Sequence, residues 1–181
     1  LSYGTDRQEI LENKIESNFS LFRKLQNNIS FTFGEKENIS DFFSSKNYQY
    51  KYQNFSESVM IKTNKKSNLS LDYSFKSKNV SEEEIDLTLH EIGVELDREI
   101  SEKSNFQSHC KYVNIEYSGS DNSILSYELM EGLSNGNNLV WGINYNNRLK
   151  NNLQINLQYS GRKSENLEIK HIGNMGITAY F

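Results

Sequence analysis

Residues 153–160 read Leu-Gln-Ile-Asn-Leu-Gln-Tyr-Ser, so apolar and polar side chains alternate without a break. Successive side chains of a β-strand point to opposite faces of a sheet. The stretch therefore predicts a strand with one apolar and one polar ribbon. Residues 139–146 alternate nearly as well, and the short polar turn between the two stretches predicts a β-hairpin.

The same unit of polar turn and alternating strand recurs along the chain. Asparagines at positions 28, 68, 105 and 152 each open such a strand, at spacings of roughly forty residues. This recurrence predicts an all-β fold of nine antiparallel, up-and-down strands. The expected strands are residues 18–24, 28–34, 57–63, 68–75, 90–100, 105–117, 138–147, 153–161 and 168–181. Residues 1–17 are expected to be irregular or a loop.

Short turns alternate with long polar connections between these strands. The long connections are residues 35–56, 76–89 and 118–137. Within the last, residues 125–130 are interpreted as an ordered loop segment, because a tenth crossing would break the alternation. Tyr48, Tyr50 and Tyr52 also alternate, so a hairpin there could extend the wall. Short turns at one end and longer loops at the other are typical of transmembrane β-barrels.

The phase of the alternation slips at two places. One lies between Leu89 and Ile92, and the other lies near Tyr112. We interpret the first as a strand start and the second as a β-bulge, which inserts one extra residue into a strand.

The composition fits a transmembrane barrel. Hydrophobic residues make up 35% of the chain and the mean hydropathy is −0.74, as expected where only every second strand residue faces lipid. No run of 18 apolar residues is present, which excludes a membrane-spanning helix. The net charge of −4 argues against a general nucleic-acid binder.

Residues 174–181, Asn-Met-Gly-Ile-Thr-Ala-Tyr-Phe, resemble the C-terminal β-signal of outer-membrane proteins. Asn174, Gly176, Ile177 and Phe181 match this pattern, whereas Ala179 departs from it because an aromatic residue is usual there. The resemblance implies the barrel-assembly machinery as a partner, since that machinery pairs with the signal as an exposed strand edge.

The region from about residue 85 to residue 181 also resembles the ends of large outer-membrane barrels from Bacteroidota. The resemblance is carried by residues 127–133, 138–141, 161–165 and 171–181. It implies a bacterial outer-membrane location, with outer-membrane lipid and lipopolysaccharide as surroundings. Nine strands would place Leu1 on the extracellular side, whereas complete bacterial barrels have an even strand number. We therefore expect the C-terminal part of a larger barrel, with other subunits of an outer-membrane complex as further candidate partners.

The strand pattern also predicts two sets of functional side chains. Aromatic residues near the strand ends are expected to form the girdles that lie at membrane interfaces: Trp141, Tyr145, Tyr159 and Phe181. The polar ribbons are expected to face the lumen: Asn144, Asn146, Gln154, Asn156, Gln158 and Thr178.

Together these features predict an integral outer-membrane protein whose strands form the C-terminal wall of a pore, translocon or assembly barrel. We expect no enzymatic activity, cofactor or metal, because no Gly-x-Ser-x-Gly elbow and no metal-ligand spacing of histidines or cysteines is present. The alternative is a soluble up-and-down barrel that binds a small lipophilic ligand. In that alternative the apolar ribbons would point inward.

Overall fold

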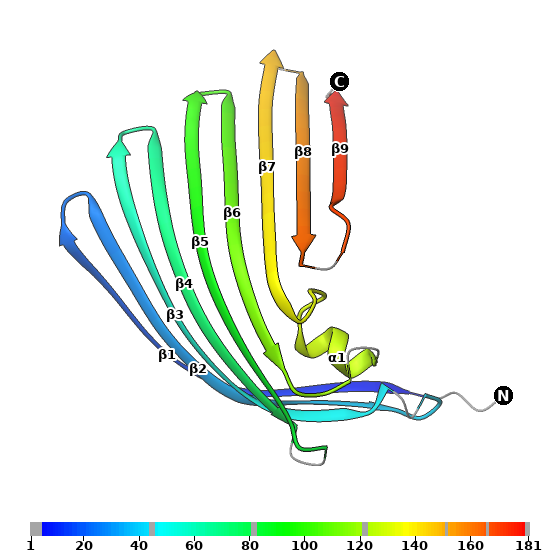
Figure 1. Cartoon of the computed structure of the whole chain (residues 1–181). Helices are drawn as coiled ribbons and strands as arrows, with labels where there is room; N and C mark the ends of the chain where they lie inside the picture. Colours follow the sequence, from blue (N-terminus) through cyan, green and yellow to red (C-terminus); the bar gives the residue numbers. More distant parts are fainter. Residues whose placement is uncertain are drawn as a thin grey trace.

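Nine strands form one antiparallel sheet whose spatial order follows the chain. The computed structural model describes residues 5–43, 46–80, 83–120, 123–150, 152–165 and 167–179. The elements are β1 (Asp6–Phe22), β2 (Leu25–Ser40), β3 (Tyr48–Asn64), β4 (Ser67–Val80), β5 (Ile85–Ser101), β6 (Ser104–Tyr117), α1 (Ile124–Leu129), β7 (Gly136–Lys150), β8 (Leu153–Ser164) and β9 (Lys170–Ala179). The predicted nine-stranded, up-and-down arrangement is confirmed (Figure 1).

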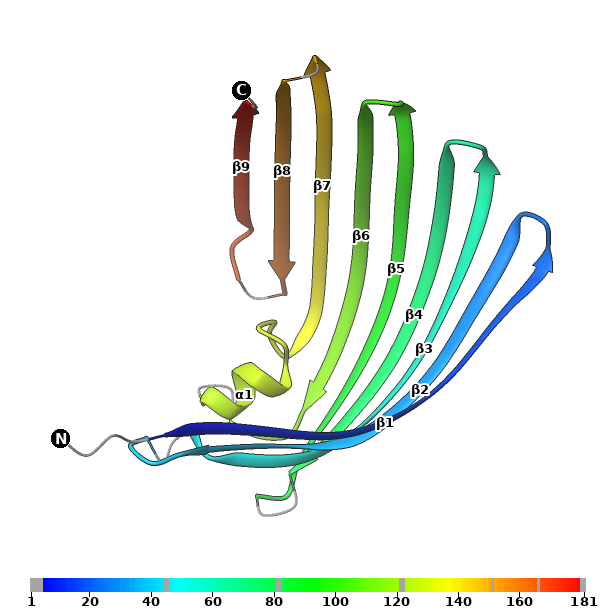
Figure 2. The same ribbon diagram turned by 180° about the vertical axis from the view of Figure 1, so that it is seen from behind.

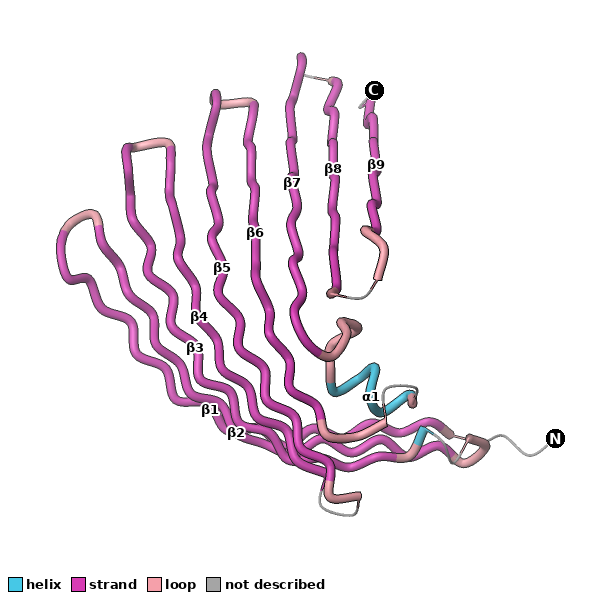
Figure 3. The backbone as a smooth tube through the Cα atoms, viewed as in Figure 1, coloured by secondary structure: helices cyan, strands magenta, loops and turns pink. Residues whose placement is uncertain are grey.

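The sheet is strongly curved, with its short turns at one end and the longer connections at the other (Figures 1 and 2). The connection between β6 and β7 carries α1 and folds into the concave side of the sheet. The sheet is not closed, because in the part of the chain that the structure describes β1 and β9 each pair with a neighbour on one side only. The trace in Figure 3 shows these two strands at opposite edges.

Several strands are longer than the sequence pattern predicts. Most of the expected loop at residues 35–56 is strand, since β2 and β3 pair from Asn38 and Tyr48 down to the short turns. The proposed wall extension at Tyr48 is therefore confirmed. Most of the expected loop at residues 76–89 likewise belongs to β4 and β5. The convex face of these outer halves is polar, and their apolar side chains, such as Tyr50, Leu87 and Leu89, lie on the concave face instead. The apolar ribbon therefore changes face along the strands, which obscures the strand pattern in the sequence.

The expectation of an irregular segment over residues 1–17 is wrong for residues 6–17. They belong to β1, which pairs with β2 from Asp6 opposite Ser40 to Phe22 opposite Leu25. Residues 1–4 lie outside the described residues. Every residue of β1 is exposed, so its strand state comes from backbone pairing with β2 rather than from a buried face.

The main hydrophobic core lies between α1 and the concave face of the sheet. Leu125, Leu129 and Met130 on the loop pack against buried side chains of the strands. The strand side chains in this cluster are Tyr50, Val80, Ile85, Leu87, Leu89, Val113, Ile115 and Tyr117. Leu87 and Leu129 are completely buried. Burial of apolar surface therefore fixes α1 against the wall.

This core explains the two slips in the alternation. The pairing of β5 with both β4 and β6 runs without a register shift from Leu87 to Arg98, so the predicted β-bulge near Tyr112 and the strand start near Leu89 are wrong. Leu87 and Leu89 face α1 on the concave side, whereas Ile92 lies on the convex face and is 60% exposed. The apolar ribbon changes face because the outer part of the strand packs against α1 on the concave side, whereas the inner part contributes to the apolar convex face.

Aromatic rings lie over glycines on neighbouring strands. Trp141 and Gly161 are directly paired on β7 and β8, and a Cβ added at Gly161 would lie 2.3 Å from the indole. Tyr52 covers Gly34 in the same way on the concave face. Each glycine leaves room for an aromatic ring from the neighbouring strand.

We predict that Gly161→Ala displaces the Trp141 ring and lowers the free energy of unfolding by about 1–3 kcal/mol, because the added methyl group overlaps the indole. Trp141 is the only tryptophan, so its fluorescence and a denaturant titration report both effects. Gly173→Ala is the matched control, since a Cβ there meets no atom within 4 Å. Equal changes in the two variants would contradict the packing described here.

Candidate functional site

The convex face carries a band of apolar side chains that runs from β1 to β9 and is interrupted on β3 by Glu57, the direct partner of Tyr73. We call it the convex apolar band, and its exposed members include Ile15, Phe19, Phe31, Phe33, Leu71, Tyr73, Ile92, Val94, Tyr112, Leu139, Ile143, Leu157, Tyr159, Met175 and Ile177. Water-soluble monomers rarely expose a contiguous apolar patch that crosses a whole sheet. A band of this size therefore marks a membrane-facing or a protein-covered surface.

The boundary of the band on the side of the long connections is inclined to the strands. Stepping from Tyr159 on β8 to its direct partner on the next strand, and repeating this across six strand spacings, leads to Leu25 on β2. The band on β2 nevertheless ends at Phe33, eight residues further along, before the polar residues Glu35 and Glu37. At ~3.3 Å per residue and ~4.8 Å per strand spacing, this offset corresponds to strands tilted by about 40°. Transmembrane barrels have such a tilt, about 35–45°.

The expected girdle residues that the structure describes lie on the convex face. Trp141 and Tyr159 lie near the boundary of the band on the side of the long connections. The Tyr159 hydroxyl forms a hydrogen bond with Nδ1 of His171 at 2.8 Å. Tyr145 lies nearer the short turns and accepts a hydrogen bond from Asn147. Phe181 lies outside the described residues.

The residues expected to face the lumen lie on the concave face. Gln158 pairs directly with Asn144 and Asn174, Asn156 with Asn146 and Gly176, and Gln154 with Thr178. Direct partners in a sheet share a face, and this face continues to Arg162, whose guanidinium donates to the Gly132 carbonyl of the α1 connection at 2.9 Å. The amides of β7, β8 and β9 therefore form one polar surface on the side of α1.

The residues of the proposed assembly signal belong to β9, an edge strand. Asn174 and Gly176 lie on the concave face, while Ile177 is 61% exposed on the convex face. All residues of β9 are exposed. The edge of this strand is thus free of other described strands, as pairing with an assembly factor would require.

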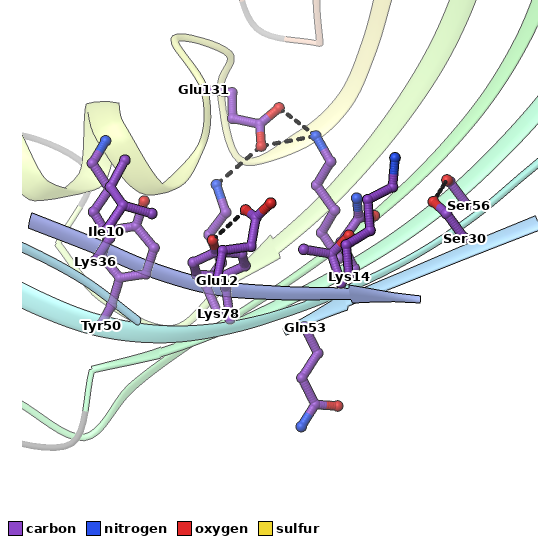
Figure 4. Close-up of a pocket in the computed structure, with 14 residues that line it drawn as sticks. Ile10, Glu12, Lys14, Ser30, Lys36, Tyr50, Gln53, Ser56, Lys78 and Glu131 are labelled. Carbon is purple, nitrogen blue, oxygen red and sulfur yellow. Dashed lines mark hydrogen bonds and ion pairs between the residues drawn. The ribbon is translucent and has the colours of Figure 1, made fainter. Parts of the chain in front are cut away.

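An ion-pair cluster ties the α1 connection to the opposite half of the wall (Figure 4). Lys76 and Lys78 on β4 both bind the Glu131 carboxylate, at 2.8 and 3.0 Å. Lys78 also donates to the Leu129 carbonyl at 2.7 Å, and Lys36 on β2 pairs with Glu128. We call Lys36, Lys76, Lys78, Glu128 and Glu131 the loop clamp.

The clamp borders a cavity of about 520 Å³ on the concave face. Glu12 and Lys14 of β1 also line this cavity, and in Figure 4 Gln53 points to the other side of the sheet. The cavity therefore lies next to the apolar core, and most of the side chains that line it are polar or charged.

Glu131 is ionised more readily than an ordinary glutamate. Its partial burial favours the neutral form, but the charge of Lys78 and the hydrogen bond from Lys76 outweigh burial and lower its pKa. The lowered pKa means that the folded loop favours the carboxylate form.

The far end of the α1 connection is fixed by Asn138, which is 2% exposed. Its amide nitrogen donates to the carbonyls of Ser134 and Gly136 at 2.8 and 3.1 Å, while its oxygen accepts from the Ser164 hydroxyl at 2.6 Å. A buried amide with satisfied partners holds its surroundings in one arrangement.

Sequence reasoning missed the loop clamp and an acidic stripe on β5. The stripe follows alternate concave positions at Glu91, Glu95, Asp97 and Glu99. Glu91 pairs with Lys111 at 2.9 Å. The available signal was that Lys76 and Lys78 continue the polar ribbon of β4 past Ser74, which argues against a loop there.

The histidines do not gather into one site. His90 and His171 lie on the convex face beside Tyr73 and Tyr159, whereas His109 lies on the concave face over Gly142. Among the described residues, no group of three or more His, Cys, Asp and Glu side chains is placed to hold a metal ion. Within the same residues, no helix is long and apolar enough to cross a membrane.

No protein-family model and no curated protein matches the sequence. Solved structures do match. "Outer-membrane expressed OmpT of Vibrio cholerae" has a TM-score of 0.62 at 11% identity, over 97% of this chain and 57% of that chain. OmpT folded in vitro, described as an outer membrane protein of Vibrio cholerae in trimer form, has a TM-score of 0.61 at 11% identity, over 95% and 55% of the two chains.

The chain thus spans just over half the length of these solved structures. The likeness shows the fold, which is the up-and-down strand arrangement of outer-membrane β-barrel proteins. None of these comparisons supports the finer resemblance to Bacteroidota.

We predict that Leu129→Ala loosens the α1 connection while the sheet persists. The lost side chain is completely buried, and a cavity of this kind costs about 2–5 kcal/mol. Hydrogen exchange of residues 124–133 should accelerate, while exchange in β7 and β8 stays slow. Ile124→Ala, on the same helix but 48% exposed, is the control, and equal acceleration in both variants would refute the packing role of Leu129.

We also predict that acid releases the α1 connection. The pKa of Glu131 is lowered in the folded state. The contribution of its carboxylate to the stability of the folded connection is therefore complete above the ordinary pKa of 4.5 and is lost as the pH falls below that value. Proteolysis by an acid-stable protease at residues 118–135 should therefore increase below pH 4.5. Glu131→Gln should show raised cleavage above this pH as well. Glu116→Gln, on the convex face, should behave as the unmodified chain, and a matching loss there would contradict the clamp.

Proposed function

We propose that this chain forms part of the wall of an outer-membrane β-barrel whose water-filled lumen is narrowed by the α1 connection. The convex apolar band carries the proposal, because it needs hydrocarbon on the outside of the sheet. In lipid, closed strand pairing satisfies the backbone polar groups, and the aromatic rims of the band lie at headgroup level. The role is structural and transport-related, as a pore wall, and includes no catalytic step.

The geometry opposes the alternative of a soluble barrel with a lipophilic ligand inside. In such a barrel the apolar ribbons would line the interior. Here Leu157 and Tyr159 lie on the convex face, while the concave positions of β7, β8 and β9 are mostly amides and hydroxyls. The apolar part of the concave face is filled by Leu125 and Leu129 of the chain itself.

The orientation in the membrane follows from the two ends of the sheet. The short turns would lie in the periplasm and the longer connections outside the cell. The polar halves of β2, β3, β4 and β5 then extend beyond the membrane, and the α1 connection enters the lumen from the outer side. Lys163 follows Tyr159 on the convex face, where lipopolysaccharide phosphates would lie. The exposed β9 edge is the segment proposed to engage the assembly machinery.

The proposal predicts a strong difference between two adjacent arginine substitutions on β8. Ile155 belongs to the convex ribbon of β8, on the short-turn side of Leu157, and Gln154 belongs to the concave ribbon. Ile155→Arg should destabilise the protein in phospholipid bilayers by up to about 2–4 kcal/mol, the cost at the middle of the membrane, because the charge enters hydrocarbon. Gln154→Arg should cost far less, because its side chain faces water.

Reversible urea unfolding in bilayers measures both variants, and asparagine substitutions at the same positions separate the charge from the change in size. Equal costs for the two arginine variants would contradict a lipid-facing convex side. A protein that stays monodisperse without detergent or lipid would contradict the proposal as a whole.

A further inference from the structure

We propose that the free edges of β1 and β9 are joined by an odd number of antiparallel, amphipathic strands from a polypeptide sequence other than a second copy of this chain. The inference rests on the proposed function, because only a barrel wall in lipid requires both edges to be covered. It goes further by specifying what covers them.

The directions of the two edge strands determine whether the number of added strands is odd or even. β1 ends at Phe22, which pairs with Leu25 beside the short turn at residues 23–24. β9 ends with Ala179 opposite Leu153, which follows the short turn between β7 and β8. Both strands therefore run from the long-connection end to the short-turn end. All eight interfaces in the sheet are antiparallel. An odd number of added strands continues this pattern at both edges and gives an even total.

Self-closure of the nine strands is opposed by the α1 connection. A barrel of about eight strands has an interior just wide enough for its own side chains. A helix with its side chains is about 10–12 Å wide. Here α1 already lies on the concave face, with Leu129 completely buried against the wall. A ring of nine strands would have no room for it, and its seam would pair β1 and β9 in parallel.

A second copy meets the same obstacle at its seams. Two copies in one membrane must have the same orientation, so β9 of one copy would run parallel to β1 of the other. Two parallel seams would interrupt an otherwise antiparallel wall, and parallel pairing is less stable per residue. The lengths also differ, since β1 has 17 residues and β9 has 10.

The edges define the chemistry of the missing strands. Those beside β9 need only the length of the membrane-spanning zone, whereas those beside β1 must extend into the outer aqueous zone along Asp6–Glu12. They must place apolar residues level with Ile15 and Ile177 on the outside and polar residues on the inside. The solved OmpT structures accommodate these nine strands in 57% and 55% of their chains, so a fold of this kind continues beyond a wall of this size.

The test combines hydrogen exchange with cross-linking on protein extracted from the envelope of the cells that make it. The amides of residues 6–10 lie beyond Leu11, the last exposed apolar side chain on the convex face of β1, so their exchange reports pairing rather than shielding by lipid. Antiparallel pairing with β2 alone protects alternate amides. We expect consecutive amides to be protected, because both sides of β1 are paired.

Cross-linking identifies what does the pairing. In a Cys110→Ser background, cysteines at Ser17 or Phe19 are combined with cysteines at Met175 or Ile177 and treated with a short bis-maleimide. We expect no link between β1 and β9, within one chain or between copies. Ser17→Cys with Ile29→Cys, which are direct partners on β1 and β2, is the positive control.

Consecutive protection without a β1–β9 link supports the proposal. A link within the chain or between two copies overturns it, because either would show that these nine strands close on themselves or on a second copy. Alternate rather than consecutive protection overturns it as well, since the β1 edge would then be free. These failures are distinguishable from failure of the proposed function, which the arginine pair at Ile155 and Gln154 tests separately.

Discussion

Pairing of each strand with its neighbours is the constraint on which this structure depends, and the proposed membrane setting makes that constraint strict. A strand in hydrocarbon has no solvent to satisfy its amide and carbonyl groups, so each strand must be paired along its length. Nine strands in chain order meet this demand through eight antiparallel ladders. With the backbone satisfied by its neighbours, the side chains need only match the medium on each face.

In the proposed barrel the two faces meet different media, and α1 modifies this simple arrangement. The convex band is apolar over the zone assigned to lipid and becomes polar at Glu35 and Glu37 on β2. On the concave side the wall is polar except beneath α1, where Leu87, Leu89 and Ile115 are buried. Hydrophobic contact holds the helix, and the loop clamp fixes its acidic end to β2 and β4.

The sequence predicted the fold class, the strand order and the hairpin of β7 and β8, because residues 153–160 alternate cleanly between two media. It did not predict residues 6–17 of β1, because every side chain there is exposed and the hydropathy has no clean period of two. It also assigned Ile85, Leu87 and Leu89 of β5 to a loop, although they alternate, because the apolar ribbon changes face before Ile92. The placement of Asn144 and Gln158 on one face followed from the same alternation. The loop clamp could not be predicted, since Lys36 and Glu128 are separated by 92 positions and meet only through the curvature of the sheet.

The change of face in the apolar ribbon of β5 and β6 has a consequence for the proposed pore. There, Leu87, Leu89, Val113 and Ile115 would form an apolar stretch of the inner wall, which α1 and its flanking residues cover in the described part of the chain. If the helix swung away, this stretch would be bared to the channel. Narrow apolar sections of a pore tend to expel water and so block ions without any physical plug. In the proposed pore, the segment that narrows the lumen would therefore also keep that part of its wall wettable.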